Sequence, residues 1–348
     1  MTKRADITID DVAEAAGVSR QTVSRVINRG PHVKPLVRDR VQKAIDSLGY
    51  VPNLSARRMA GSRSYLILAI NDRKRTIENW AAGRGNDWVD QMLFGGMTEC
   101  ERQGYHLLFE LIDTETEPAL RQLANVSGAL RPDGVILTPP HSDNEALCAW
   151  LTERSIPFAR IGHRVGSHSV DVFMDEAGAA HEATRGLIAL GHSRIAYIAG
   201  APNYGASAQR ISGYEQALRE AGATLETSMV ATGGFSFQAA ADIIDGMLKS
   251  SPAPSAFICD NDEMAFAALH VAASHGFSAP QDLSVISFED TPGVRFSVPP
   301  LTAVRQPTAA MIARACERLI AISRGEEGWG AFQIPYELIM RDSTGPAP

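Results

Sequence analysis

The chain has 348 residues, 45% hydrophobic and 21% charged, values typical of a soluble globular protein with two or three domains. No apolar run approaches the roughly 20 residues of a membrane span, and no secretory signal opens the chain, so we expect a cytoplasmic protein. The four cysteines match no zinc or haem spacing and the histidines form no HExxH pattern, so we expect no metal and no cofactor.

The formal net charge of −7 is unevenly distributed along the chain. Residues 1–64 contain twelve Lys or Arg and six Asp or Glu, whereas the remaining residues contain 21 basic and 34 acidic side chains. A small basic module joined to a large acidic body indicates a polyanionic partner for the first part only.

Two short helices are expected close to the N-terminus. Thr8 is a suitable N-cap for the first helix, and Gly17 suits the left-handed turn that would end it. Ser19 can cap a second helix over about 20–27, which turns its valines inward. The side chains left outside on this second helix are polar or basic: Arg20, Gln21, Thr22, Ser24 and Arg25.

A third helix is expected to begin at Pro35 and to end near Gly49. Three short helices with a tight turn between the first two form helix-turn-helix geometry, whose second helix fits the DNA major groove. Arg pairs with guanine and Gln with adenine, while hydroxyl and amide side chains suit phosphate oxygens. The alternative is a polar surface helix in an ordinary helical bundle.

The segments "ITIDDVAEAAGVSRQTVSRVIN" and "VRDRVQKAIDSLGYVPNLSARRMAG" resemble the DNA-binding headpiece of the LacI/GalR family of bacterial transcriptional regulators. The resemblance covers nearly the whole chain and divides it into a headpiece (1–51), a hinge (52–64) and an effector-binding and dimerisation body (65–348). It implies base contacts by Arg20, Gln21 and Arg25. It implies DNA-backbone contacts by Thr8, Ser19, Thr22, Ser24, Asn28 and Lys34.

Two departures concern the headpiece. Arg20 stands where a family headpiece that shares Gln21 and Arg25 has tyrosine, so a somewhat different operator half-site is expected. Lys34 stands where a capping serine is usual, which weakens the cap of the third helix and adds a possible phosphate contact.

The hinge is short, basic and punctuated by Pro and Gly, and a free helix of this length is marginal in water. In the family, the hinge folds on DNA into a helix that enters the minor groove, which implies contacts by Asn53, Ala56 and Met59. Met59 replaces the leucine that wedges between bases, and methionine is apolar and flexible enough to insert. A flexible tether is the alternative.

Short apolar runs alternate with amphipathic segments in residues 65–348, a pattern that predicts parallel sheets with right-handed crossovers. One set of expected strands covers 65–70, 106–111, 134–138 and 158–162. A second set covers 170–174, 195–200, 256–259 and 284–288. Two such sets create a cleft at the carboxyl ends of the strands, where ligands bind.

The body resembles periplasmic sugar-binding proteins, whose two-lobed α/β fold the family's effector domain shares. Fragments such as "GHSRIAYIAG" and "PPLTAVRQP" carry the resemblance. Because the family's chain crosses between lobes three times, the first lobe is expected at about 65–168 plus about 305–333. The second is expected at about 169–304 plus about 334–348.

The resemblance also implies an effector pocket, with binding residues Trp88, His163, Asp175, Arg210, Phe235, Asn261 and Glu289. Arg210 and Asn261 keep the usual residue types, whereas Glu289 replaces an aspartate and His163 takes a place often filled by arginine. Thr138, at the end of an expected strand, is a weaker candidate. Without the resemblance, a lone Trp or Phe is more often a core residue than a ligand platform.

The segment 71–85, "NDRKRTIENWAAGRG", is longer than the corresponding family loop by about a dozen residues. It is charged and carries Trp80, so it could form a lid on the cleft. We expect a solvated loop instead.

No GxGxxG after a strand, GxSxG or Walker loop is present, which argues against an enzyme, and the headpiece argues against a transported-solute binding protein. The resemblance implies a homodimeric, nucleoid-associated repressor of carbohydrate or glycoside genes, which binds a pseudopalindromic operator and a sugar effector. A nucleobase or another metabolite acting as corepressor is the alternative. The chain ends in "STGPAP" without leucine heptads, so we expect a dimer rather than a tetramer.

Overall fold

The computed structural model describes residues 7–27, 33–50, 63–83, 86–162, 168–223 and 226–348. The chain forms two compact units, one up to Tyr65 and one from Leu66 to Pro348. Among the described residues, no helix is long and apolar enough to cross a membrane.

The first unit contains the three expected helices, α1 (Ile9–Ala16), α2 (Arg20–Ile27) and α3 (Pro35–Leu48). Both expected N-caps are confirmed, because the Thr8 hydroxyl accepts from the Asp11 amide and the Ser19 hydroxyl accepts from the Thr22 amide. Gly17 adopts the left-handed conformation with φ 61°. The small core that joins the helices is built from Val12, Ala13, Ala16, Val23, Val26, Val41 and Ala44.

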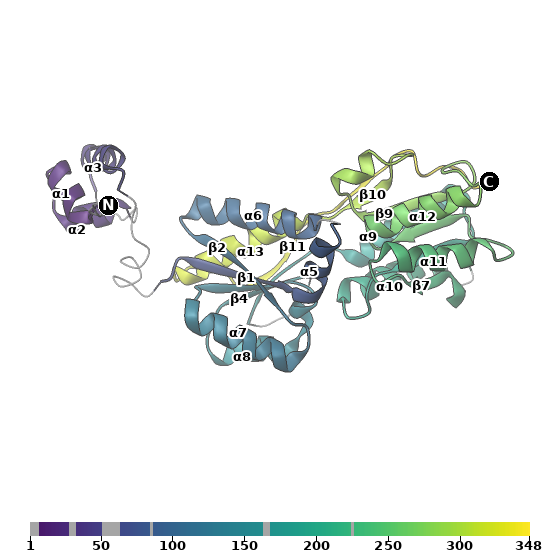
Figure 1. Ribbon diagram of the computed structural model, residues 1–348, viewed down its shortest axis with the longest axis horizontal. Coiled ribbons are helices and arrows are strands. Elements are labelled where there is room, and N and C mark those ends of the chain that lie inside the picture. The colour runs from purple at the N-terminus through teal and green to yellow at the C-terminus, as the bar shows by residue number, and fades with distance from the viewer. Residues whose placement is uncertain (1–6, 28–32, 51–62, 84–85, 163–167, 224–225) are drawn as a thin grey trace. The chain divides into compact units, whose positions relative to one another are not determined.

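The second unit consists of two six-stranded sheets with helices packed against them (Figure 1). The first sheet has the order β11-β5-β4-β3-β1-β2. Its strands are β1 (Leu66–Asp72), β2 (His106–Ile112), β3 (Gly134–Leu137), β4 (Phe158–Ile161), β5 (Val170–Phe173) and β11 (Gly330–Gln333). This first lobe also contains α5 (Arg73–Ala81), α6 (Asp87–Gln103), α7 (Thr116–Leu130), η1 (His141–Asp143), α8 (Glu145–Glu153) and α13 (Thr308–Ser323).

The second sheet has the order β12-β10-β9-β8-β6-β7. Its strands are β6 (Ile195–Ala199), β7 (Val230–Thr232), β8 (Ala256–Cys259), β9 (Ser284–Glu289), β10 (Thr302–Arg305) and β12 (Glu337–Ile339), of which β12 is antiparallel to β10. The second lobe also contains α9 (Glu176–Ala189), α10 (Gly205–Glu220), η2 (Thr227–Met229), α11 (Phe237–Leu248), α12 (Asp262–Ser274) and η3 (Pro292–Arg295). All eight expected strands are present.

The expected assignment of strand 170–174 to the second lobe is wrong. This strand, β5, pairs in parallel with β4 and with β11, so it belongs to the first sheet and the lobe boundary falls after it. A strand buried on both faces has no alternating pattern, and its sequence does not reveal which of two parallel sheets it joins.

The interpretation of 71–85 as a loop is also wrong for its described part. Residues 73–81 form α5, which begins at Asp72, whose carboxylate accepts from the Arg75 amide at 3.0 Å. Among the residues of α5, Thr76 alone is buried, so the segment shows no apolar periodicity. Trp80 lies edge-on to Phe109, with ring centroids 6.5 Å apart.

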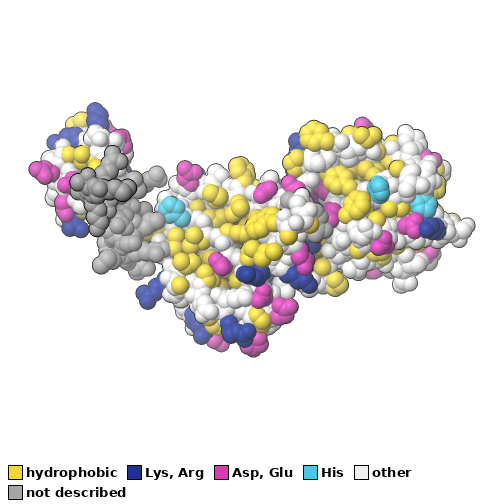
Figure 2. Space-filling model, in the orientation of Figure 1, with side chains coloured by type: hydrophobic (Ala, Val, Ile, Leu, Met, Phe, Trp, Pro, Cys, Tyr) yellow, Lys and Arg dark blue, Asp and Glu magenta, His cyan; other side chains and the backbone are white. Residues whose placement is uncertain are grey.

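Exposed apolar side chains occur on both lobes. In α6 of the first lobe, Phe94 is 66% exposed and Met97 is 57% exposed. In the second lobe, Phe296 is 82% exposed and Val298 is 93% exposed. Figure 2 shows hydrophobic side chains gathered on the viewed face of the first lobe over α6 and α13.

Candidate functional site

A cavity of about 440 Å³ lies between the two lobes of the second unit. Asn71 and Asp72 line it from the end of β1, while Asp260 and Asn261 follow β8 and Glu289 ends β9. Both sheets therefore direct the carboxyl ends of their strands toward the same space, as expected for a ligand site in such folds.

The cavity brings together five of the seven residues predicted to bind an effector. Trp88, Arg210, Phe235, Asn261 and Glu289 all line it, although they come from separate parts of the chain. His163 falls outside the described residues.

Asp175, the remaining one of the seven, and the weaker candidate Thr138 do not line the cavity. Asp175 caps α9, where its carboxylate accepts from the Gly178 amide at 3.1 Å, and the adjacent Glu176 lines the cavity instead. Thr138 is fully buried behind the wall, where its hydroxyl donates to the side-chain oxygen of Asn71 at 2.7 Å. Neither side chain lines the cavity in this structure.

Arg210 is a buried cation held by two carboxylates. Its Nε donates to Glu176 at 2.7 Å, and its Nη1 donates to the backbone oxygen of Asp260 at 2.8 Å and lies 3.4 Å from the Asp260 carboxylate. The guanidinium also lies 4.2 Å from the centroid of the Phe288 ring. Such complete pairing compensates the cost of burying the charge and fixes the guanidinium in the cavity wall.

Close helix packing makes this ion pair possible. A Cβ atom at Gly213 in α10 would lie 2.0 Å from the backbone oxygen of Ala177 in α9, so only glycine permits the two helices to approach this closely. The approach brings Arg210 of α10 to Glu176 at the start of α9.

Glu289 and Asp262 form an acidic pair in the cavity wall. Burial raises the pKa of Glu289 to about 8, and the Asp262 charge raises it too, whereas Arg75 and Arg210 lower it. The Asp262 carboxylate accepts from the Thr291 amide at 2.7 Å, and its other oxygen has no hydrogen-bond partner among the described residues. The pair can therefore accept hydrogen bonds from a ligand, and Glu289 can donate one when protonated.

The sequence interpretation missed several lining residues. Arg75 and Thr76 come from α5, and Tyr204 precedes α10, where its hydroxyl donates to Asp72 at 3.0 Å. The position of Asp72 at the end of a buried strand was a usable signal for a cleft residue. Arg75 gave no such signal, because its helix was taken for a loop.

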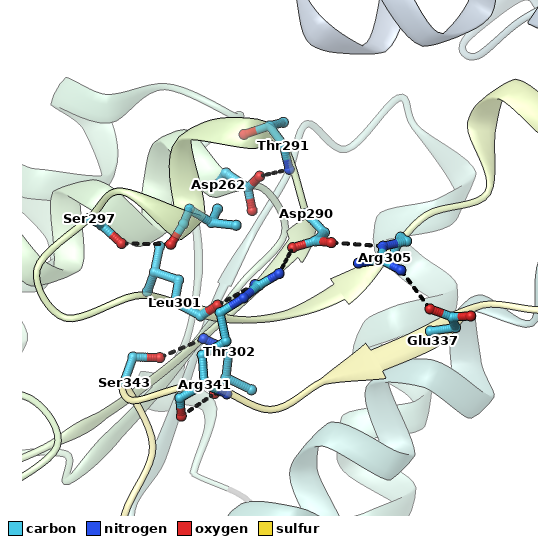
Figure 3. A network of polar contacts seen from close by, with 11 residues as sticks. Asp262, Asp290, Thr291, Ser297, Leu301, Thr302, Arg305, Glu337, Arg341 and Ser343 are labelled. Atoms are coloured by element: carbon cyan, nitrogen blue, oxygen red, sulfur yellow. Dashed lines mark hydrogen bonds and ion pairs between the residues drawn. The ribbon is translucent and has the colours of Figure 1, made fainter.

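A polar network beside the cavity joins the strands through which the chain passes between lobes (Figure 3). The Asp290 carboxylate is fully buried and accepts from Arg305 at 2.8 Å and from Arg341. Arg305 also donates to Glu337 at 2.7 Å. Arg305 ends β10, just before the chain crosses to α13 of the first lobe, and Glu337 begins β12, just after the chain returns to the second lobe. The network therefore links two of the segments that cross between the lobes to Asp290, the neighbour of Glu289.

In the first unit, Arg20, Gln21 and Arg25 are exposed on α2, while Thr22 and Ser24 are half-buried. Arg20 lies 3.6 Å from the Asp10 carboxylate, with both side chains largely exposed. Lys34 is exposed and supplies no side-chain cap to α3, as expected from its replacement of a capping residue. The predicted DNA contacts Asn28, Asn53, Ala56 and Met59 lie outside the described residues.

A helix-turn-helix unit followed by a two-lobed ligand-binding fold defines a class of DNA-binding regulatory proteins. Residues 8–53 match the bacterial regulatory proteins of the lacI family, and residues 184–344 match the periplasmic binding protein-like domain. The HTH-type transcriptional regulator CelR of Thermobifida fusca is 32% identical over 332 residues, which cover 94% of each chain. The repressor PurR of Vibrio atlanticus is 31% identical, covering 97% of this chain and 98% of its own.

Solved structures of regulators show the same architecture. A CelR–cellobiose complex superposes with a TM-score of 0.72 at 28% identity, and a lac repressor dimer bound to operator superposes with 0.78 at 25% identity. Each comparison covers 97% of this chain and 99% of the other. The chain belongs to the lacI family of DNA-binding transcriptional regulators, and these relatives are not enzymes.

Proposed function

We propose that this chain is a homodimeric repressor of carbohydrate- or glycoside-utilisation genes, controlled by a sugar in the interlobe cavity. The observation that carries the proposal is the cavity wall, which combines the aromatic side chains of Trp88, Tyr204 and Phe235 with hydrogen-bonding groups from both lobes. Aromatic rings suit the C–H faces of a sugar, and carboxylate and amide groups suit its hydroxyls. The CelR–cellobiose complex supports this ligand class.

A nucleobase or another metabolite acting as corepressor is the second candidate. The PurR relative supports it, and the aromatic rings of the same cavity could stack on a flat base. The acidic wall favours the sugar, because the carboxyl groups of Glu289 and Asp262 can accept hydrogen bonds from several sugar hydroxyls at once.

For operator recognition, we assign base contacts to Arg20, Gln21 and Arg25, whose side chains are exposed on α2. The exposed ion pair between Arg20 and Asp10, at 3.6 Å, leaves the Arg20 side chain accessible to a base. Backbone contacts are assigned to Thr8, Ser19, Thr22, Ser24, Asn28 and Lys34, and minor-groove contacts to Asn53, Ala56 and Met59.

The homodimer is supported by the exposed apolar side chains on both lobes. Phe94, Met97, Phe296 and Val298 would each be buried by a second copy of the chain. The lac repressor structure at 25% identity is a dimer on operator DNA, which supports the same assembly here. Two-fold symmetry would place two headpieces on a pseudopalindromic operator.

Control of DNA binding would follow from the relative position of the lobes. A ligand bound to Glu289 would lie beside Asp290. Asp290 is linked through Arg305 to Glu337, so this network connects two segments that cross between the lobes. A shift of the lobes would change the spacing of the two hinges in the dimer and so the affinity for the operator. The operator would change effector affinity by the same factor.

The proposal is tested by selecting an operator from random duplex DNA and titrating it at fixed salt, because phosphate contacts make the affinity salt-dependent. The ligand panel contains cellobiose, other mono- and disaccharides, and purine bases. Release of the operator by one sugar would support an inducer-controlled repressor. Tightening of the complex by a purine would support the second candidate, and the absence of any selected palindrome would contradict the DNA-binding role.

A further inference from the structure

Helix α5 places a cationic side chain in the cleft. Arg75 is half-buried and lines the cavity from the first lobe. Its position is fixed by the start of the helix, since its amide donates to the Asp72 carboxylate that caps α5. Its side chain therefore extends from a rigid element rather than from a loop.

The contacts of the Arg75 guanidinium belong to the second lobe. Its central carbon lies 4.4 Å from the ring centroid of Phe235 and 5.9 Å from that of Tyr204. The two rings form an edge-to-face pair, 5.2 Å apart at 73°. The positive charge also lowers the pKa of Glu289. One cation from the first lobe thus meets two aromatic faces and one carboxyl group of the second.

Arg75 differs from Arg210 in how it is held. Arg210 is fixed by two carboxylates, whereas the Arg75 side chain donates no hydrogen bond within the described part of the chain. The Arg75 guanidinium is held by cation–π contacts with two rings and by electrostatic attraction to Glu289. Its N–H groups therefore remain available as hydrogen-bond donors to a ligand. Its contacts can therefore be exchanged for those of an effector.

Two further contacts join the lobes at the same place. The Tyr204 hydroxyl donates to the Asp72 carboxylate at 3.0 Å, and the Gly205 amide donates to the Asp143 carboxylate at 3.2 Å. The start of α5 and the start of α10 therefore face each other across the cleft, and Arg75 and Glu289 both line the same cavity.

We propose that Arg75 is a positioning residue that holds the lobes together in the absence of an effector, by lying on the Phe235 and Tyr204 rings in the place of a ligand. An effector would then enter beside Arg75 and offer oxygen atoms to its N–H donors, a step that rests on the proposed function. The contact between Arg75 and the second lobe does not rest on it. Loss of the guanidinium should raise the ratio of open to closed lobes by roughly 3- to 30-fold.

The test measures the distance between lobes in the full chain without ligand or DNA. Spin labels are attached to Ala129→Cys in α7 and Ala273→Cys in α12, two exposed positions on different lobes. The four native cysteines are buried, so labelling is selective for the introduced pair. Labelled chains are diluted with unlabelled protein so that an oligomer carries a single labelled copy, and pulsed electron paramagnetic resonance gives the distance distribution.

The compared substitutions are Arg75→Met, Arg75→Lys and Phe235→Leu, with Arg73→Met as the matched control. Arg73 lies on the same helix, but it is exposed and does not line the cavity. We expect a new population at altered distance with Arg75→Met and with Phe235→Leu, partial restoration with Arg75→Lys, and the wild-type distribution with Arg73→Met. Adding Arg75→Met to Phe235→Leu should produce little further change, because both remove the same contact.

A distribution for Arg75→Met that superposes on the wild type would overturn the proposal. Equal shifts with Arg73→Met and Arg75→Met would also overturn it, since they would assign the effect to the helix as a whole. Because neither effector nor operator is present, these results are independent of whether the protein proves to be a sugar-responsive repressor.

Discussion

The substitution Arg210→Met removes the buried cation on which two cavity carboxylates depend. The Arg210 side chain is 4% exposed, that of Glu176 is 7% exposed and that of Asp260 is 0% exposed, so water cannot replace the lost charge. Removing one partner from such a buried group costs about 3–5 kcal/mol of stability, and methionine retains most of the packing volume. Two buried carboxylates would then remain without the cation that compensates them.

The assay is urea unfolding of the full chain, followed by the far-ultraviolet circular dichroism of the two-lobed unit. The control is Arg194→Met, because Arg194 also contacts a carboxylate, at 2.6 Å, but is 24% exposed and its partner Glu226 is 42% exposed. A partly solvated pair of this kind contributes roughly 0–1 kcal/mol. Equal losses for the two variants would refute the reasoning.

Three further predictions concern the cavity, the assembly and the headpiece. Burial raises the pKa of Glu289 to about 8, so this carboxyl stabilises the fold while protonated and loses that contribution as the pH rises through its folded pKa. Glu289→Gln should therefore flatten the decline of the unfolding free energy between about pH 5 and pH 8, measured by urea titration. Phe94→Glu should yield monomers in sedimentation velocity, while an unchanged dimer would exclude α6 from the interface. Arg25→Ala should cost about 1–3 kcal/mol in binding the selected operator, whereas Lys34→Ala should reduce the slope of log affinity against log salt by about 1. Both are read from operator titrations at several salt concentrations, and a sequence-independent loss at Arg25 would contradict its base-reading role.

The headpiece was predictable because its determinants are local. The Thr8 and Ser19 caps and the Gly17 turn each act within one helical turn, and the valine spacing fixes the buried face. Strands of the body such as β1 and β6 were recognisable for a similar reason, since each is a continuous buried run.

The cavity was predictable only in part, because its geometry depends on contacts between distant segments. The resemblance identified Arg210, Asn261 and Glu289, but not that Glu176 rather than its neighbour Asp175 faces the cavity. Asp175 is the N-cap of α9 and its carboxylate bonds to the Gly178 amide, so the next residue, Glu176, is the one that faces the cavity. The sheet to which β5 belongs is likewise set by its pairing with β4 and not by its own residues. The contribution of α5 depends on a polar helix that carries no periodic apolar signal.

The most direct test of the central claim is a reciprocal binding measurement with the wild-type protein. Operator affinity is measured with and without the active sugar, and sugar affinity with and without operator, at one salt concentration. A ligand bound in the cavity that controls the headpieces must change both affinities by the same factor, and we predict a change of about 5- to 150-fold. A sugar that binds tightly while leaving operator affinity unchanged would contradict the account, because occupancy of the cavity would then have no influence on DNA binding.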